Sequence, residues 1–238
     1  MSQITATTTA AAQHPVRAWS GVPILLIALV AAFLFHIAVG AKQLPISTVF
    51  EALISFDSTN FDHVIVQNLR LPRAALALVV GASLSLAGAL MQGVTRNPLA
   101  DPGLLGLTTG AAVAVVVAHS VFGFTSMAFT PWIAMSGALG AAVIVFFISR
   151  MVPGGATPLS MTLAGAAVSA FLGTIISVIH LLNQDTFENL RVWLTGTLAG
   201  RDITLLWYVG PWMLIALVGG ILLAPRVTVL AMGDEGAA

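Results

Sequence analysis

Six long apolar runs, none with an internal Asp, Glu, Lys or Arg, constrain the fold more than any other feature of the sequence. They cover about 22–40, 74–94, 104–122, 131–149, 159–182 and 204–224. A transmembrane helix needs about 20 predominantly apolar residues, and a charge at its centre costs about 2.5–3.5 kcal/mol. The runs are too long for barrel strands and do not alternate, so we predict an all-α, polytopic transmembrane helical bundle with six spans.

The composition supports a membrane location and excludes several classes of function. Hydrophobic residues make up 58% of the chain and charged residues only 8%, whereas about 25% of the residues in a soluble domain are charged. The net charge of zero offers no basic field for nucleic acid. Without cysteine, disulfides and thiol nucleophiles are excluded. The sequence shows no catalytic cluster and no Walker A loop, so we predict a protein that is not an enzyme and has no cofactor or metal site.

The first part of the chain precedes the apolar runs. Residues 1–21 are mostly small and polar and are predicted to form a disordered leader. The run at 22–40 is longer than the apolar region of a signal peptide, which is about 7–15 residues. This length favours an uncleaved first span over a cleaved signal peptide, and we predict a transmembrane domain over 22–224.

Capping side chains followed by proline mark the starts of several predicted helices. The pairs are Asp101-Pro102, Thr130-Pro131 and Thr157-Pro158, and Asp202 is placed to cap the last run. Proline at the first helical position loses no useful donor, and the capping oxygen accepts from a free backbone N–H. Between the second and third runs we predict a helix break with caps, formed by Asn97, Pro98, Asp101, Pro102 and Gly103.

Two links between the runs are longer than simple turns. Residues 41–69 contain a short amphipathic piece, ISTVFEALI, followed by a polar stretch. Residues 183–202 are predicted to contain a short interfacial helix with Trp193 as an anchor. If six spans alternate, both links lie on one side of the membrane with five basic residues, against four on the other side. This difference is too small to orient the chain by the excess of basic residues inside.

Small residues recur every four positions in two of the runs. One set is Ala77, Gly81, Ser85 and Ala89, and the other is Gly165, Ser169, Gly173 and Ser177. Small side chains let helices approach closely in lipid, where packing drives association. The second set therefore predicts either a close-packing face or a smooth, weakly polar wall of a transport pathway.

Two arginines, Arg70 and Arg73, precede the second apolar run in the stretch NLRLPRAALALVVG. Residues three apart lie on one face of an α-helix, so we expect both side chains on the same face. Interfacial snorkelling of the two side chains is one interpretation. Recognition of carboxylates is the other, because guanidinium groups stay charged and pair with carboxylates in a fork geometry.

A long motif gives these features a family context. It comprises RLPR at 70–73, GALMQ at 88–92 and NPLADPGLLG at 97–106. With LAGAAVSAFLGT at 163–174, VWLTGTLAGRD at 192–202 and LAMGDE at 230–235, it resembles the permease family of bacterial ABC importers for iron–siderophores, haem and cobalamin. Members of that family resemble a bundle of about ten helices, so the resemblance implies that a chain with six spans is C-terminally truncated.

The resemblance implies an orientation, partners and contact residues. It places the N-terminus in the cytoplasm of a multi-pass protein of the cell inner membrane. It implies a second permease copy or paralogue, cytoplasmic ATP-binding subunits that hydrolyse ATP, and a periplasmic or lipoprotein substrate-binding protein. Arg70 and Arg73 would dock that binding protein. The segment 225–238 would begin the cytoplasmic loop that couples to the ATPase, through Gly233, Asp234 and Glu235.

The resemblance leaves the cargo open. An iron(III)–siderophore or related metal chelate is the first expectation, and cobalamin or haem is the alternative, since permeases for all of them share these motifs. A non-functional truncated product of such a gene is a further alternative.

Overall fold

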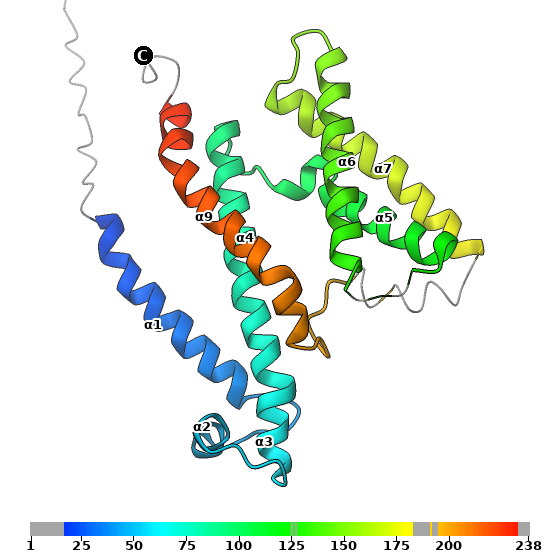
Figure 1. Cartoon of the computed structure of the whole chain (residues 1–238). Coiled ribbons are helices and arrows are strands. Elements are labelled where there is room, and N and C mark those ends of the chain that lie inside the picture. The colour runs from blue at the N-terminus through cyan, green and yellow to red at the C-terminus, as the bar shows by residue number, and fades with distance from the viewer. Residues whose placement is uncertain (1–16, 125, 127, 183–190, 192–194, 233–238) are drawn as a thin grey trace, which may run out of the picture. The chain divides into compact units, whose positions relative to one another are not determined.

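A computed structural model describes residues 17–124, 126, 128–182, 191 and 195–232 (Figure 1). All regular structure in these residues is helical, which confirms the all-α prediction. The chain divides into two compact units, one ending at Ala74 and the other beginning at Ala75.

The first unit holds one long helix and several short helical pieces. Its elements are α1 (Arg17–Ala38), α2 (Ile46–Ile54), α3 (Phe61–Ile65), the π-helical turn η1 (Val66–Arg70) and the first residues of α4 (Leu71–Thr95). The buried core comprises Ile37, Leu44, Val49, Ala52, Val66 and Ala74. The amphipathic piece of the first link is therefore a helix whose Val49 and Ala52 pack inward. Because α1 already begins at Arg17, the predicted disorder is wrong for 17–21.

Proline explains the π-turn before α4. Pro72 has no N–H, and in a regular α-helix its ring would clash with the carbonyl of Asn68. The turn opens by one residue instead, and the Leu71 N–H donates to the carbonyl of Val66, five residues back. The helical segment Phe61–Thr95 runs for 35 residues. From the sequence we predicted that the arginines at 70 and 73 precede the membrane-spanning helix. They lie instead within a continuous helical segment.

The second unit contains the remaining spans. After α4, its elements are the 3₁₀ turn η2 (Pro102–Leu105), α5 (Leu107–Phe122), α6 (Thr130–Met151), α7 (Pro158–Leu182) and α9 (Thr204–Met232). Helices α5, α6 and α7 pack against one another. One buried cluster joins Val115 and Val116 to side chains of α6 and α7. A second cluster is centred on Val145, Ala164 and Val168.

Five helical segments in the described residues are long and apolar enough to cross a membrane. They are Gly21–Ala38, Phe61–Thr95, Thr130–Met151, Pro158–Leu182 and Thr204–Ala231. The third predicted span is different, because α5 has only 16 residues. At 1.5 Å per residue such a helix is about 24 Å long, short of the roughly 30 Å hydrocarbon core. Left-handed Gly106 separates α5 from η2, which interrupts the run predicted at 104–122.

Two of the predicted helix caps have the expected hydrogen bonds at α7 and α9. The Thr157 hydroxyl accepts from the Ser160 N–H at 3.2 Å, and the Ser160 hydroxyl accepts from the Thr157 N–H at 2.9 Å. Asp202 accepts from the Thr204 N–H at 2.7 Å, and hydrogen bonding by Thr204 lowers the pKa of that carboxyl group. Thr130 is not a cap, because it lies inside α6 and its hydroxyl donates to the Ser126 carbonyl.

The last described helix is longer than predicted. Helix α9 runs through Pro225 to Met232, so the segment assigned to a cytoplasmic loop from 225 is still helical over its first residues. Gly233, Asp234 and Glu235, and most of the interfacial helix predicted around Trp193, lie outside the described residues.

Helices α5 and α6 cross at two glycines. A Cβ atom added to Gly137 would lie 2.4 Å from the Gly110 carbonyl oxygen and 2.4 Å from the Cβ of Ala114. A Cβ atom at Gly110 would lie 2.6 Å from the Gly137 carbonyl oxygen. Close backbone approach in lipid depends on such small residues. Small residues four apart, Gly110 with Ala114 on α5 and Gly137 with Ala141 on α6, were the available signal for this crossing, and sequence analysis missed it.

We predict that Gly137→Ala destabilises the packing of α5 on α6. The added methyl group meets backbone and Ala114, which cannot move aside without separating the helices, and overpacking costs about 1–3 kcal/mol. The measurement is thermal unfolding in detergent micelles. Gly140→Ala, on the same helix with nothing within 4 Å of its added Cβ, is the matched control. Equal melting temperatures for the two variants would contradict the crossing.

Candidate functional site

The two arginines of the RLPR motif have different surroundings. Arg73 is exposed, whereas Arg70 is 9% exposed. The Nη1 group of Arg70 donates to the carbonyl of Ile37 at 2.6 Å and to that of Ala38 at 2.8 Å. Its Nη2 group donates to the carbonyl of Lys42. The two arginines therefore differ in exposure and in hydrogen bonding, a difference that their spacing in the sequence did not predict.

The segment 39–60 is tied to the helical segment that follows it. The Lys42 ammonium pairs with the Asp62 carboxylate, and the Gln67 amide donates to the carbonyl of Ala52 at 2.7 Å. Near its tip, Asp57 accepts from the Thr59 hydroxyl at 2.7 Å and from the Thr59 N–H at 2.8 Å. These bonds lower the pKa of the Asp57 carboxyl group. The segment thus presents a fixed, polar tip between α2 and α3.

The predicted helix break is a chain of turns held by side chains. Helix α4 ends at Thr95, and Arg96 takes a left-handed conformation with φ of 51°. The Asn97 side chain accepts from the Leu99 N–H at 2.9 Å. Asp101 accepts from the Gly103 N–H at 2.6 Å, so it caps η2, with Pro102 as the first residue of that turn. The predicted break residues thus lie together.

The sequence predicted that Asp101 caps the third long helix, but Asp101 caps η2 and not α5. Left-handed Gly106, with φ of 76°, ends η2 and begins α5. Gly106 follows the apolar pair Leu104 and Leu105, and a glycine there is a signal for a helix end. The prediction of a continuous run over 104–122 overlooked it. The result is a discontinuous element, in which a 3₁₀ turn and a short helix meet at one glycine.

A cavity of about 420 Å³ lies beside this break. It is bounded by the end of α4, the turns at 97–105 and the start of α7. Its lining is mainly apolar, with Leu99, at 83% exposed, at its edge. The polar groups of Asn97 and Asp101 are already used within the turns. This cavity therefore suits an apolar side chain better than a charged ligand.

The four small residues spaced along α7, which are Gly165, Ser169, Gly173 and Ser177, have two kinds of surroundings. A Cβ atom at Gly165 would lie 2.1 Å from the carbonyl oxygen of Leu104, and one at Gly106 would lie 3.2 Å from the hydroxyl of Ser169. Gly165 and Ser169 therefore pack closely on η2 and Gly106. A Cβ atom at Gly173 would meet nothing within 4 Å, and the exposed Ser177 donates only to the Gly173 carbonyl, at 3.0 Å. Close packing thus accounts for Gly165 and Ser169, and the pathway interpretation is left for Gly173 and Ser177.

We predict that Gly165→Ala disrupts the break while Gly173→Ala is tolerated. At Gly165 the new methyl group meets the Leu104 backbone, so α7 or η2 must move. At Gly173 the space is open. Helix propensity favours alanine over glycine by about 0.5–1 kcal/mol at both positions, so only packing separates the variants. Thermal unfolding in lipid nanodiscs should give a lower melting temperature for Gly165→Ala alone. The opposite order would refute this packing.

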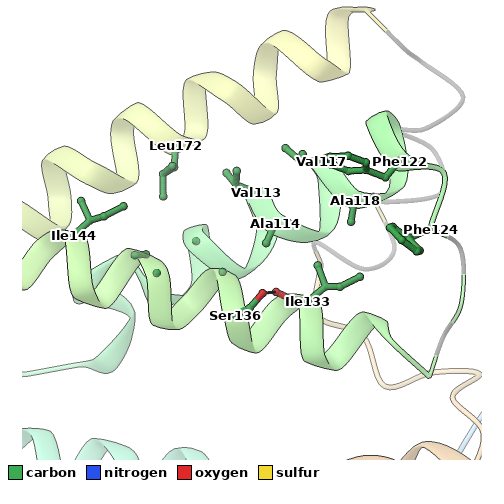
Figure 2. A pocket seen from close by; sticks show the side chains of 14 residues that line it. Val113, Ala114, Val117, Ala118, Phe122, Phe124, Ile133, Ser136, Ile144 and Leu172 are labelled. Carbon is green, nitrogen blue, oxygen red and sulfur yellow. Dashed lines mark hydrogen bonds between the residues drawn. The ribbon is translucent and has the colours of Figure 1, made fainter.

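A second cavity, of about 460 Å³, lies among α5, α6 and α7 (Figure 2). Val113 and Val117 of α5, Ile133 and Ile144 of α6, and Leu172 of α7 line it. The hydroxyl of Ser136 donates to the Ile133 carbonyl at 2.8 Å, within its own helix. The lining therefore offers an apolar surface and no charged group to hold a polar solute.

Neither cavity is lined by a histidine, a cysteine or a glutamate. Among the described residues, no group of three or more His, Cys, Asp or Glu side chains could hold a metal ion. The described side chains pack, cap helix ends and tie segments together.

These features define a polytopic helical membrane protein. The chain belongs to the FecCD transport family, whose model matches residues 27–238. It is 42% identical over 216 residues to the ferric enterobactin transport system permease protein FepD of Escherichia coli K12, covering 91% of this chain and 64% of FepD. It is 36% identical to the siderophore transport system permease protein YfiZ of Bacillus subtilis 168, covering 91% of this chain and 65% of YfiZ.

A solved structure shares the fold. It shows an inward-facing conformation of a metal-chelate type ABC transporter, with a TM-score of 0.71 and 25% sequence identity. The match covers 92% of this chain and 65% of that chain. The chain thus spans just under two thirds of the length of each of these three proteins.

Proposed function

We propose that the chain is the transmembrane permease part of an ATP-driven importer. Its cargo is an iron(III)–siderophore or a related metal chelate, carried across the inner membrane. The observation that carries the proposal is the match of the family model to residues 27–238, within a fold shared with a metal-chelate type transporter. The names of the two relatives, which refer to ferric enterobactin and to a siderophore, favour an iron chelate over cobalamin or haem.

The proposal includes a division of labour between subunits. In this division, ATP hydrolysis belongs to cytoplasmic ATP-binding subunits. A second permease copy or paralogue completes the membrane pathway, and a periplasmic or lipoprotein binding protein delivers the chelate. The apolar cavities fit this division, because a permease wall that holds no charged ligand lets a large solute pass without gripping it.

A chimera tests the transport function of the chain despite its partial coverage. The chain replaces the matching 216 residues of FepD in Escherichia coli cells that lack FepD. We expect these cells to take up ⁵⁵Fe(III)–enterobactin in an energy-dependent manner. Uptake of labelled cobalamin by the same cells, in place of the iron complex, would favour the alternative cargo. A chimera that inserts into the membrane and carries neither solute would overturn the proposal.

The proposed orientation places the N-terminus in the cytoplasm and the segment 39–60 outside. The chain has no cysteine, so single cysteines report their location without background. We predict that a membrane-impermeant maleimide added to intact spheroplasts labels Ser58→Cys but not Leu99→Cys. Both positions are exposed, so accessibility within the protein does not limit labelling. Permeabilised cells should label both variants. The reverse pattern in intact spheroplasts would refute the orientation.

Of the two arginines, Arg73 has the exposure needed to meet carboxylates of a binding protein. We predict that Arg73→Glu in the chimera lowers uptake several-fold at low ionic strength, because opposite charges steer encounter between partners. Arg73→Lys keeps the charge and should retain most of the uptake. The difference should shrink as salt screens the charges. Equal uptake by the Glu and Lys variants at low salt would exclude docking through Arg73 and leave snorkelling as its role.

A further inference from the structure

The guanidinium of Arg70 closes the end of α1. Helix α1 ends at Ala38, and the last carbonyl groups of any helix lack intrahelical donors. Arg70 donates to the carbonyls of Ile37 and Ala38 at 2.6 and 2.8 Å. Ile37 is fully buried, and a buried carbonyl group without a donor is costly. A cation at a helix C-terminus is also favoured by the helix dipole.

The same side chain holds the segment that follows α1. Its Nη2 group donates to the carbonyl of Lys42, four residues beyond the end of the helix. One planar group thus joins two helix-end carbonyls and one loop carbonyl. The donors of a guanidinium are fixed in a fork, so one arginine can serve several acceptors at once. The single ammonium of a lysine has no such spread.

Gly40 provides the space for this arrangement. A Cβ atom added at Gly40 would lie 2.9 Å from Nη2 and 3.1 Å from Cζ of Arg70. Its backbone does not have a positive φ, so glycine is needed here for space and not for conformation. Because the obstructed atoms belong to the end of a flexible side chain, an alanine at position 40 should displace the guanidinium and leave the backbone of α1 intact.

Arg70 and Arg73 have different places in this arrangement. Arg70 is the last residue of the π-turn, in which the Leu71 N–H donates to the carbonyl of Val66, and its side chain is buried at the end of α1. Arg73 lies in the regular helix beyond the turn and is exposed.

We propose that Arg70 is a positioning residue that locks the C-terminus of α1 and the segment 39–45 to the π-turn. The lock holds the segment 39–60 in place, and Arg73 is left as the cation of this pair that is free to meet a partner. The lock itself follows from contacts within one compact unit. Only the purpose of holding the segment for a binding protein rests on the proposed function.

Hydrogen–deuterium exchange of the chain in lipid nanodiscs tests the lock without any partner. We expect Arg70→Lys to raise the exchange of amides in 39–48 at least tenfold, and Gly40→Ala to raise it similarly. Amide exchange in the double variant should be no faster than in either single variant, because each substitution removes the same interaction. Exchange in α6, in the other unit, should not change. Arg73→Lys and Gly21→Ala, whose added Cβ meets nothing within 4 Å, are the matched controls.

A guanidinium rescue separates the lock from general loss of folding. Arg70→Ala should also raise exchange in 39–48, and guanidinium chloride at non-denaturing concentration should restore protection, while ammonium chloride at equal ionic strength should not. If Arg70→Lys keeps parental protection, the guanidinium fork is not required and the proposal is wrong. Additive effects of Arg70→Lys and Gly40→Ala would also overturn it, because they would show that the residues act separately.

The salt dependence of uptake by the FepD chimera distinguishes a positioning role of Arg70 from direct contact with the partner. We expect Arg70→Lys to lower uptake without changing its dependence on salt, whereas changes at Arg73 alter that dependence. A changed salt dependence in Arg70→Lys would mean that Arg70 itself meets the partner. The exchange experiment needs no transport, so failure of the lock and failure of the transport function are distinguished.

Discussion

Backbone polar groups that lose their helical partners at a membrane must find other partners, and this constraint governs the described structure. Water satisfies such groups at the surface of a protein, but no water is present in the hydrocarbon core, and buried groups also need partners within the protein. Arg70 supplies donors at the end of α1, and Asp101 accepts a free N–H at the start of η2. In the π-turn before Pro72, the Leu71 N–H donates to the carbonyl of Val66. At each of these points, where the regular helical bonding is interrupted, a side chain or a backbone group supplies a hydrogen bond.

Close approach between helices is the second constraint, and it depends on position more than on spacing. Small residues four apart occur on α4, α5, α6 and α7. Backbone contact is formed where Gly110 meets Gly137 and where Gly165 meets Leu104, while Gly81 on α4 has nothing within 4 Å of an added Cβ. Spacing shows that a helix face permits close contact. Which faces meet is decided by the fold, so the sequence could not separate these helices.

The fold class and most helices could be predicted, because apolar length and charge exclusion are local properties of the sequence. The caps at Thr157 and Asp202 were also local, since each side chain bonds a backbone group only two or three residues away. The broken third span and the buried Arg70 were not predicted. Gly106 is one apolar-compatible residue inside an apolar run, and Arg70 finds its acceptors 28–33 residues earlier in the chain. No periodicity reports such distant partners.

The RLPR motif shows how four residues can divide tasks that their chemistry alone would assign equally. Both arginines carry the same charge and the same donors. Arg70, the last residue of the π-turn, donates to the carbonyls at the end of α1. Once three acceptors hold that guanidinium, a new partner would have to offer better bonds than three carbonyls already in place. Arg73 carries no such cost, because it is already exposed. A motif that resembles a docking pair therefore contains, in this chain, one anchor and one available charge.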